Sequence, residues 1–143
     1  MLLTYPAVFF MTDDDSIPFY IVFPDVEGVG TQGKSITDGM EMASDYLGLM
    51  LADLLEQNEK LPKPSKVNSI DVPQVASEIE VDYIPEESFV TLVSVNLSEY
   101  LEMNELKKKT LTIPKWADKL GMDLKINFSQ TLVEAIVEKA QQQ

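Results

Sequence analysis

The sequence predicts an α+β protein in two parts: an antiparallel sheet with one long helix, followed by a short strand–helix–helix module. Runs of β-branched and aromatic residues separated by turn residues predict the strands. A long stretch with apolar residues at steps of three and four predicts the main helix. The net charge changes sign near residue 105, so we expect residues 1–104 and residues 105–143 to form separate domains.

The charge of the chain is divided unequally between these two parts. Residues 1–104 carry 4 lysines and 19 acidic residues, a net charge of −15, whereas residues 105–143 carry 7 lysines and 5 acidic residues, a net charge of +2. An acidic domain is repelled by nucleic acid and attracted to a basic protein. Only the second part is therefore expected to approach phosphate groups.

The composition excludes several kinds of chemistry. The chain contains no histidine and no cysteine, so a Ser-His-Asp or Cys-His nucleophile and a His- or Cys-ligated zinc site are impossible. No apolar run approaches the roughly 20 residues that span a bilayer, and the first residues lack the basic segment of a secretory signal. We expect a cytoplasmic protein with no membrane contact, no cofactor, no metal and no catalytic residues.

The first part is predicted to begin with a β-hairpin. Residues 2–10 and 19–23 are rich in β-branched and aromatic side chains, and residues 13–16 between them are turn residues. Glycines then mark an irregular stretch around a short third strand near residues 29–31.

A long helix is predicted next. Ser35 is expected to cap its start, with Asp38 three residues on completing an approximate capping box, and the helix should fade near residues 57–58. One apolar stripe is expected to pack on the sheet while acidic residues face water. The stripe consists of Ile36, Met40, Ala43, Leu47, Met50 and Leu54.

The remainder of the first part is predicted to be irregular up to a last strand. Prolines recur between residues 58 and 88, which indicates a long connection with one short turn of helix near residues 75–79. Residues 89–95 are rich in strongly β-forming side chains and predict a strand in the same sheet.

The order of the N-terminal motifs resembles that of a known family. Tyr5-Pro6-Ala7-Val8-Phe9 is followed by an acidic turn, by Tyr20-Ile21-Val22-Phe23-Pro24-Asp25-Val26-Glu27-Gly28, by Thr31-Gln32-Gly33 and by the acidic helix. Over about residues 3–60 this order and spacing are similar to the HicB antitoxin family. The resemblance implies a degenerate ribonuclease-H-like fold without nuclease activity. It also implies a partner, a small basic ribonuclease toxin of the HicA type, which the antitoxin binds and inhibits.

The most informative stretch of the second part is its lysine- and threonine-rich start. Polar and apolar side chains alternate there, which predicts a strand with one polar and one apolar face. The polar face consists of Lys108, Thr110 and Thr112, and the other face of Lys109, Leu111 and Ile113.

Two helices are predicted after this strand. Pro114 ends the strand and suits the first turn of a short helix, and Gly121 is expected just beyond the C-cap of that helix. Asn127 or Ser129 is expected to cap a second, longer helix.

A strand and two helices of this size cannot bury a core alone. Pairing with the same strand of a second chain would supply both the missing strand and the missing core. Residues 107–140 resemble the ribbon–helix–helix module of the MetJ and Arc type of repressor, which places a two-stranded ribbon in the major groove. The resemblance implies a homodimer, or a tetramer of two dimers, bound to double-stranded operator DNA.

This second resemblance assigns roles to individual residues. Threonine and lysine side chains on the ribbon would face base edges, and the start of the second helix would face a phosphate. The DNA-binding residues are then Lys108, Thr110, Thr112, Asn127 and Ser129, and the dimerisation residues are Leu111, Ile113, Trp116, Leu132 and Ile136. The chain contains no arginine, so bidentate recognition of guanine by arginine is unavailable. No residue is assigned to the toxin contact.

The sequence thus predicts a non-enzymatic antitoxin that inhibits an mRNA-cleaving toxin and, as a dimer, binds operator DNA to repress its own operon. One alternative is a ribbon–helix–helix regulator whose acidic domain senses a ligand or oligomerises. Another is a divergent metal-dependent nuclease that uses Asp25 and Glu27.

Simpler interpretations accompany individual motifs. The lysine–threonine strand could be an edge strand whose charges discourage aggregation. Asp13-Asp14-Asp15 could bind a hard cation, although a solvated hairpin turn explains it more simply. Gly28-x-Gly30-x-x-Gly33 matches a dinucleotide fingerprint only in its letters, because no βαβ unit surrounds it.

Overall fold

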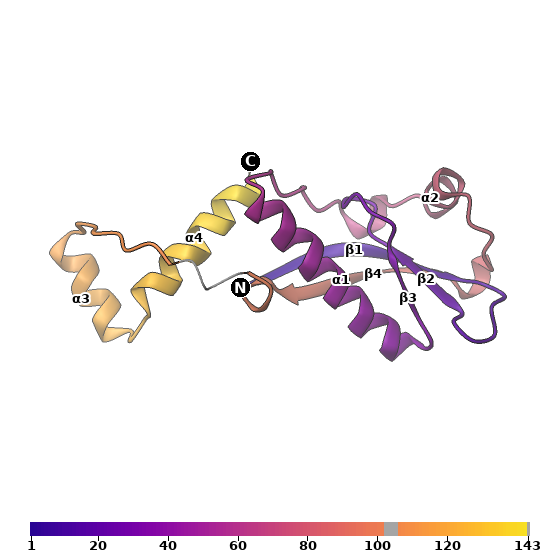
Figure 1. Ribbon diagram of the computed structural model, residues 1–143, viewed down its shortest axis with the longest axis horizontal. Coiled ribbons are helices and arrows are strands. Elements are labelled where there is room, and N and C mark those ends of the chain that lie inside the picture. Colours follow the sequence, from indigo (N-terminus) through magenta and orange to yellow (C-terminus); the bar gives the residue numbers. More distant parts are fainter. Residues whose placement is uncertain (102–105, 143) are drawn as a thin grey trace. The chain divides into compact units, whose positions relative to one another are not determined.

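A four-stranded antiparallel sheet and four α-helices make up the part of the chain that the computed structural model describes, residues 1–101 and 106–142. The chain divides into two units, Met1–Leu101 and Glu102–Gln143 (Figure 1). None of the helices described is long and apolar enough to span a membrane. The first unit contains β1 (Leu2–Met11), β2 (Phe19–Val22), β3 (Thr31–Gly33), α1 (Ile36–Glu56), α2 (Val72–Ile79) and β4 (Phe89–Asn96); the second contains α3 (Lys115–Asp123) and α4 (Phe128–Gln142).

The sheet has the strand order β3-β2-β1-β4, so β1 lies at its centre. Phe9 of β1 pairs with Ile21 of β2 on one side and with Phe89 of β4 on the other. The predicted hairpin and the predicted last strand are both confirmed. The third strand begins two residues later than predicted, because Gly30 has φ +82°, a left-handed conformation that a strand does not adopt.

Asp14 holds the turn between β1 and β2. Its Oδ1 accepts hydrogen bonds from the amides of Ile17 (3.0 Å) and Ser16 (2.9 Å), and these bonds lower the pKa of the Asp14 carboxyl below its ordinary value. The turn is therefore stabilised by the ionised carboxylate above the ordinary pKa of aspartate, and this stabilisation is lost as the pH falls through the lowered value. The structure supports the turn interpretation of this acidic run.

Helix α1 begins as the sequence predicts. The Asp38 amide donates to Ser35 Oγ (3.1 Å), and the Asp38 carboxylate accepts from the amide of Lys34 (2.8 Å) rather than from that of Ser35. The helix ends at Glu56 with Gln57 as its C-cap, close to the predicted end.

The buried side of α1 differs from the predicted stripe. Ala43 and Leu47 are buried as expected, but Ile36 is 55% exposed. The line that faces the sheet includes Gly39 and Leu51. A pattern of apolar side chains misses this line, because a glycine contributes to it through close backbone approach and not through a side chain.

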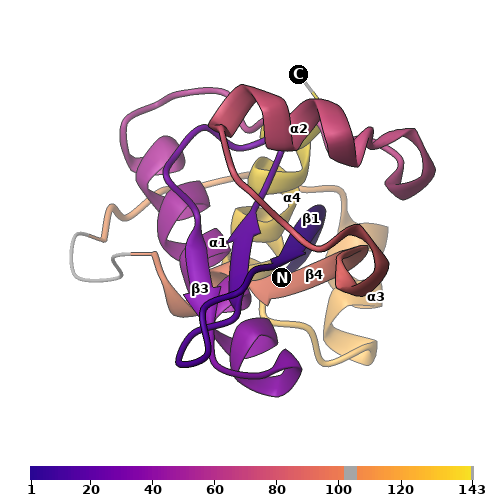
Figure 2. The ribbon, with the colours of Figure 1, turned by 90° about the vertical axis from the view of Figure 1, so that its right-hand side faces the viewer.

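The opposite face of the sheet is covered by the connection between α1 and β4. Val8, Phe10 and Val22 form a buried cluster with Ala76 of α2, and the turned view places α2 next to the strands (Figure 2). Since both faces of β1 are covered, its residues are apolar almost without interruption and not alternately polar. The helix near residues 75–79 is confirmed, and it begins three residues earlier, with Asp71 as its N-cap.

The glycine pair Gly33 and Gly39 sets how closely α1 approaches β3. A Cβ on Gly33 would lie 2.5 Å from the Cα of Gly39, a backbone atom that cannot move aside, whereas a Cβ on Gly39 would lie 3.0 Å from the ring of Phe9. Gly33→Ala is therefore expected to destabilise the fold by about 1–3 kcal/mol.

Gly39→Ala is the matched control. Its gain in helix propensity, about 1 kcal/mol, offsets part of the cost of crowding the Phe9 ring, so a smaller loss is expected. Urea denaturation at equal chain concentrations measures both variants. A Gly33→Ala chain as stable as the parent would contradict the close approach of α1 and β3.

Candidate nucleic-acid interface

The second unit consists of an extended segment, residues 106–114, followed by α3 and α4. Pro114 is the N-cap of α3, and its carbonyl accepts hydrogen bonds from the amides of Ala117 (3.0 Å) and Asp118 (3.1 Å). Proline is suited to this place because the helix requires no amide hydrogen from it. The prediction that a short helix starts at Pro114 is confirmed to within one residue.

The end of α3 differs from the prediction. Gly121 lies inside the helix, and the residue in the left-handed conformation is Lys125, with φ +55°. The amides of Lys125 and Ile126 donate to the carbonyls of Met122 (3.0 Å) and Gly121 (3.1 Å), which is the Schellman pattern. Gly121 serves a different purpose: a Cβ there would lie 2.5 Å from the ring of Phe128, so its missing side chain lets the start of α4 pack against α3.

Asn127 caps α4, as one of the two predicted alternatives. Its Oδ1 accepts from the amide of Gln130 (3.0 Å), and its carbonyl accepts from the amide of Thr131 (2.9 Å). Ser129 lies in the first turn of the helix. The two residues predicted to face a phosphate are therefore both at the amino end of α4, where backbone amides are free of intrahelical partners.

The residues predicted to form a ribbon lie on an extended segment that is not a strand in the single chain. A β-ladder needs a second strand, and residues 106–142 provide none. Lys108, Thr110 and Thr112 are exposed, and so are Leu111 (55%) and Ile113 (45%) on the other side of the segment. The pairing of this segment with a second chain remains a prediction.

The second unit has almost no core of its own. Among residues 106–142 only Gly121 and Val137 are buried, and the five predicted dimerisation residues are all exposed. Apolar side chains exposed to this extent on one small unit are unusual for a monomer. They are Leu106, Leu111, Ile113, Trp116, Leu120, Met122, Leu124, Ile126, Phe128, Leu132, Val133 and Ile136.

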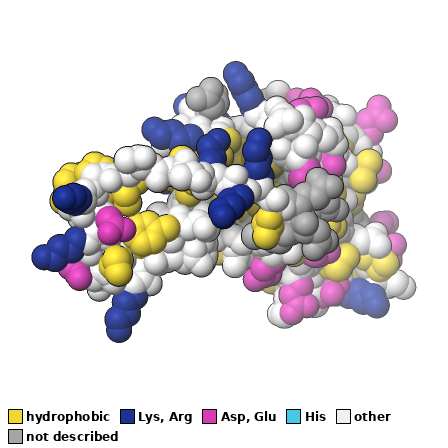
Figure 3. Space-filling view, turned by 60° about the vertical axis from the view of Figure 1, so that its left-hand side comes forward, with side chains coloured by type: hydrophobic (Ala, Val, Ile, Leu, Met, Phe, Trp, Pro, Cys, Tyr) yellow, Lys and Arg dark blue, Asp and Glu magenta, His cyan; other side chains and the backbone are white. Residues whose placement is uncertain are grey.

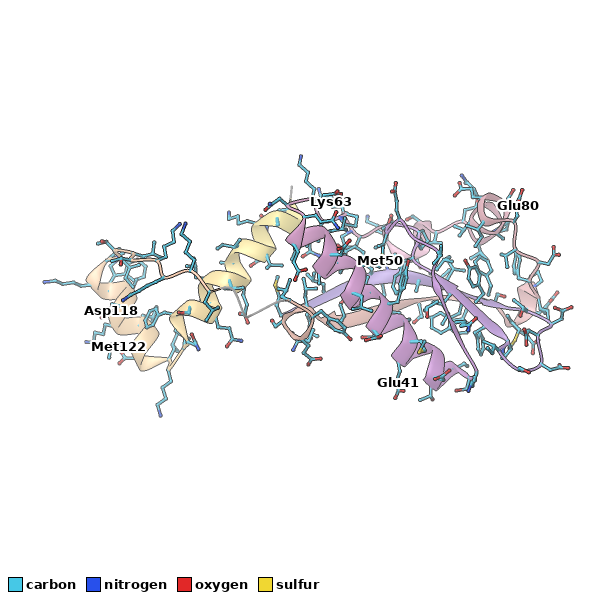
Figure 4. All side chains as sticks on the ribbon, viewed as in Figure 1. Glu41, Met50, Lys63, Glu80, Asp118 and Met122 are labelled. Carbon is cyan, nitrogen blue, oxygen red and sulfur yellow. The ribbon has the colours of Figure 1, made fainter. Side chains whose placement is uncertain are left out.

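Lysines accompany these apolar residues. In the space-filling view, in which the left side of Figure 1 comes forward, dark blue and yellow side chains lie next to one another (Figure 3). Asp118 and Met122 both project from α3 (Figure 4). The unit thus presents cationic, hydroxyl and apolar groups together. These groups can bind phosphates and base edges.

Asp25, one of the two carboxylates of the alternative nuclease interpretation, accepts hydrogen bonds from within the fold. Both oxygens of Asp25 accept hydrogen bonds from Ser65, one from its amide (2.8 Å) and one from its hydroxyl. In residues 1–101 and 106–142 no group of three or more acidic residues could hold a metal ion. Asp25 therefore ties the loop after β2 to the connection that follows α1. Sequence reasoning missed this bond, because its partners are 40 residues apart and serine in an irregular stretch carries no signal.

Comparison with known sequences finds one family of antitoxins, both as a family match and as a curated relative. Residues 4–75 match the family described as the HicB_like antitoxin of bacterial toxin–antitoxin systems. A curated relative, Antitoxin HicB 1 of Photorhabdus laumondii subsp. laumondii, is 38% identical over 64 residues, which cover 43% of this chain and 41% of that protein's length.

Comparison with solved structures extends the likeness to nearly the whole chain. A chain of a toxin–antitoxin complex from Streptococcus pneumoniae is 44% identical, with a TM-score of 0.68 over 97% of this chain and 99% of that one. The Burkholderia pseudomallei antitoxin HicB is similar in fold, with a TM-score of 0.59 and 22% identity over 96% of this chain and 98% of that one.

Removal of the Asp25 carboxylate tests its structural role. Asp25→Ala leaves the amide and hydroxyl of Ser65 without acceptors and is expected to lower the free energy of unfolding by about 1–3 kcal/mol. Glu27→Ala, two residues away on an exposed side chain, is the control and should change it by less than about 0.5 kcal/mol. Equal effects of the two changes in urea denaturation would count against the tie to Ser65.

Proposed function

We propose, from the premise that this chain belongs to the HicB-like family of antitoxins of bacterial toxin–antitoxin systems, that it binds and inhibits a basic toxin and, as a dimer, binds operator DNA. The first unit carries the toxin contact and the second unit carries the DNA contact. The similarity to a chain of the Streptococcus pneumoniae toxin–antitoxin complex, at 44% identity over nearly the whole chain, is the observation that carries the proposal.

Charge supports the toxin contact. The net charge of −15 over residues 1–104, which contain the first unit, makes this part of the chain a poor ligand for RNA and a good one for a basic, RNA-binding protein surface. A toxin of the HicA type, which cleaves mRNA, is the partner that we infer. The first unit then acts by covering that toxin, as a degenerate ribonuclease-H-like domain without catalysis and without a cofactor.

The exposed apolar residues of the second unit support the dimer. Two copies of the segment 106–114 would pair as an antiparallel ribbon, and Leu111 and Ile113 would then be buried with Trp116, Leu132 and Ile136 from the helices. This ribbon–helix–helix arrangement turns Lys108, Thr110 and Thr112 toward the major groove. The amino end of α4, with Asn127 and Ser129, then meets a phosphate. Binding to its own operator would repress the operon.

Co-purification tests the toxin partner. The chain is expressed together with the small basic protein encoded beside it, with an affinity tag on this chain alone. We expect a stoichiometric complex that leaves RNA intact, and an mRNA-cleaving activity when the small protein is released from the complex. If nothing co-elutes while the chain alone still shifts its promoter DNA, the toxin proposal fails and the regulator with a ligand-sensing or oligomerising acidic domain replaces it.

Substitution of the two threonines tests the ribbon. Thr110→Ala with Thr112→Ala should reduce the preference for operator over random DNA by about 10- to 100-fold, since one bidentate base contact contributes about 1–3 kcal/mol of discrimination and two single threonine contacts together are comparable to it. Dimerisation and toxin binding should not change. Thr37→Ala, an exposed threonine of the first unit, is the control. Unchanged operator preference in a competition gel-shift assay would show that the ribbon assignment is wrong.

A further inference from the structure

One side of α1 is free of the sheet and forms a continuous surface along the helix. Its residues recur at steps of four, three, four and four, which places them on one line, and they lie opposite the buried line that contains Ala43 and Leu47. We name this line the outer face of α1. It consists of Asp38, Met42, Asp45, Leu49 and Asp53.

Two apolar side chains lie within this acidic line. Met42 is 41% exposed and Leu49 is 56% exposed, and they are two helical turns, about 10 Å, apart. A single exposed apolar residue is ordinary on a protein surface. Two on the same helical line, each with acidic residues before and after it, instead match the arrangement of an interface, in which apolar contacts are surrounded by a polar rim.

A hollow adjoins the outer face at the amino end of α1. It has a volume of about 270 Å³ and is lined by Ile17, Gln32, Gly33, Lys34, Asp38 and Met42. Hollows of this kind receive the anchoring side chain of a partner. The charges of Asp38 and Lys34 offset each other in this lining, and Ile17 and Met42 are its apolar groups, so an apolar side chain of a partner fits the chemistry of the hollow.

The charge on α1 also favours a basic partner. The helix contains no lysine, and Glu41 projects from it beside the outer face (Figure 4). Its last turn includes Asp53 and has no basic residue, although acidic side chains near a helix C-terminus are unfavourable with the helix dipole. A cationic surface bound along α1 would offset this disadvantage.

We propose that the outer face of α1 is the surface that docks the toxin, through a basic patch with an apolar side chain between Met42 and Leu49. This inference rests on the proposed antitoxin function. The chain's own second unit is the rival occupant, because it also carries lysines and exposed apolar residues. Residues 105–143 carry a net charge of only +2, which leaves most of the acidic charge uncompensated, and in the proposed dimer a second copy covers the apolar residues of this unit.

Removal of the apolar side chains tests the docking surface. Met42→Gln with Leu49→Gln should weaken the affinity for the co-purified toxin by about 10- to 100-fold, because a few central apolar contacts carry most of the binding energy of such interfaces. Calorimetry on the full chain measures this affinity. Leu92→Gln is the control, since Leu92 of β4 is 50% exposed, nearly as much as Leu49, and lies on the sheet. It should change the affinity by less than about threefold.

Removal of two charges provides an independent measurement. Glu41→Gln with Asp53→Asn should slow association and weaken its dependence on salt. Asp13→Asn with Asp15→Asn removes the same net charge from the β1–β2 turn and should have a smaller effect. Asp45 is left unchanged because it accepts a hydrogen bond from the Tyr100 hydroxyl (3.0 Å). Circular dichroism melts show whether each variant is folded.

The outcomes separate the two proposals. Selective weakening by both α1 variants supports the docking surface. If the parent chain binds the toxin and the α1 variants bind it equally well, the docking surface is overturned while the antitoxin function stands. The same conclusion follows if the α1 variants alter only dimerisation or operator binding, because the second unit then occupies this face. If the parent chain itself binds no toxin, both proposals fail.

Discussion

The apolar residues of the second unit have too little of their own chain to cover them, and this shortage determines most of what the unit can do. A strand-forming segment without a ladder partner and two helices without a common core are not stable as an isolated piece. We therefore expect another surface to cover the side chains of Trp116, Leu132 and Ile136, which are exposed in the single chain. In the proposed dimer that surface is a second copy, and the two-fold pairing also generates the ribbon that carries Thr110 and Thr112.

The first unit solves the same problem within one chain. Both faces of β1 are covered, one by α1 and the other by α2 with its flanking connection, so the central strand is buried within a single chain. The core of this unit does not depend on its remaining surface, which can therefore carry many acidic residues. Because this unit and the second unit differ in charge by so much, the proposed surface for a basic protein and the proposed surface for phosphates are separate along the sequence.

Local signals predicted much of this fold. The Ser35 cap, the hairpin turn at Asp14, the extent of α1 and the Asn127 cap all depend on residues within a few positions of one another. The failures have a common cause. Gly121 was predicted at a helix end but lies inside α3. It is needed there for the contact with Phe128, which depends on how α3 meets α4 and leaves no local signal. The bond between Asp25 and Ser65 joins distant segments and has no local pattern. The segment 106–114 is not a strand in the single chain, because residues 106–142 supply no second strand with which it could form a ladder.

The unpaired segment 106–114 also affects how the protein responds to its own abundance. In the proposed dimer, the surface that reads DNA exists only when two chains have met. Well below the dissociation constant of the dimer, the amount of that surface follows the square of the chain concentration, so halving the supply of chain removes about three quarters of it. The proposed toxin contact, for which a single first unit would suffice, would fall only in proportion to the chain concentration. Under the proposed function, operator occupancy would therefore respond more steeply to the concentration of the chain than toxin neutralisation would.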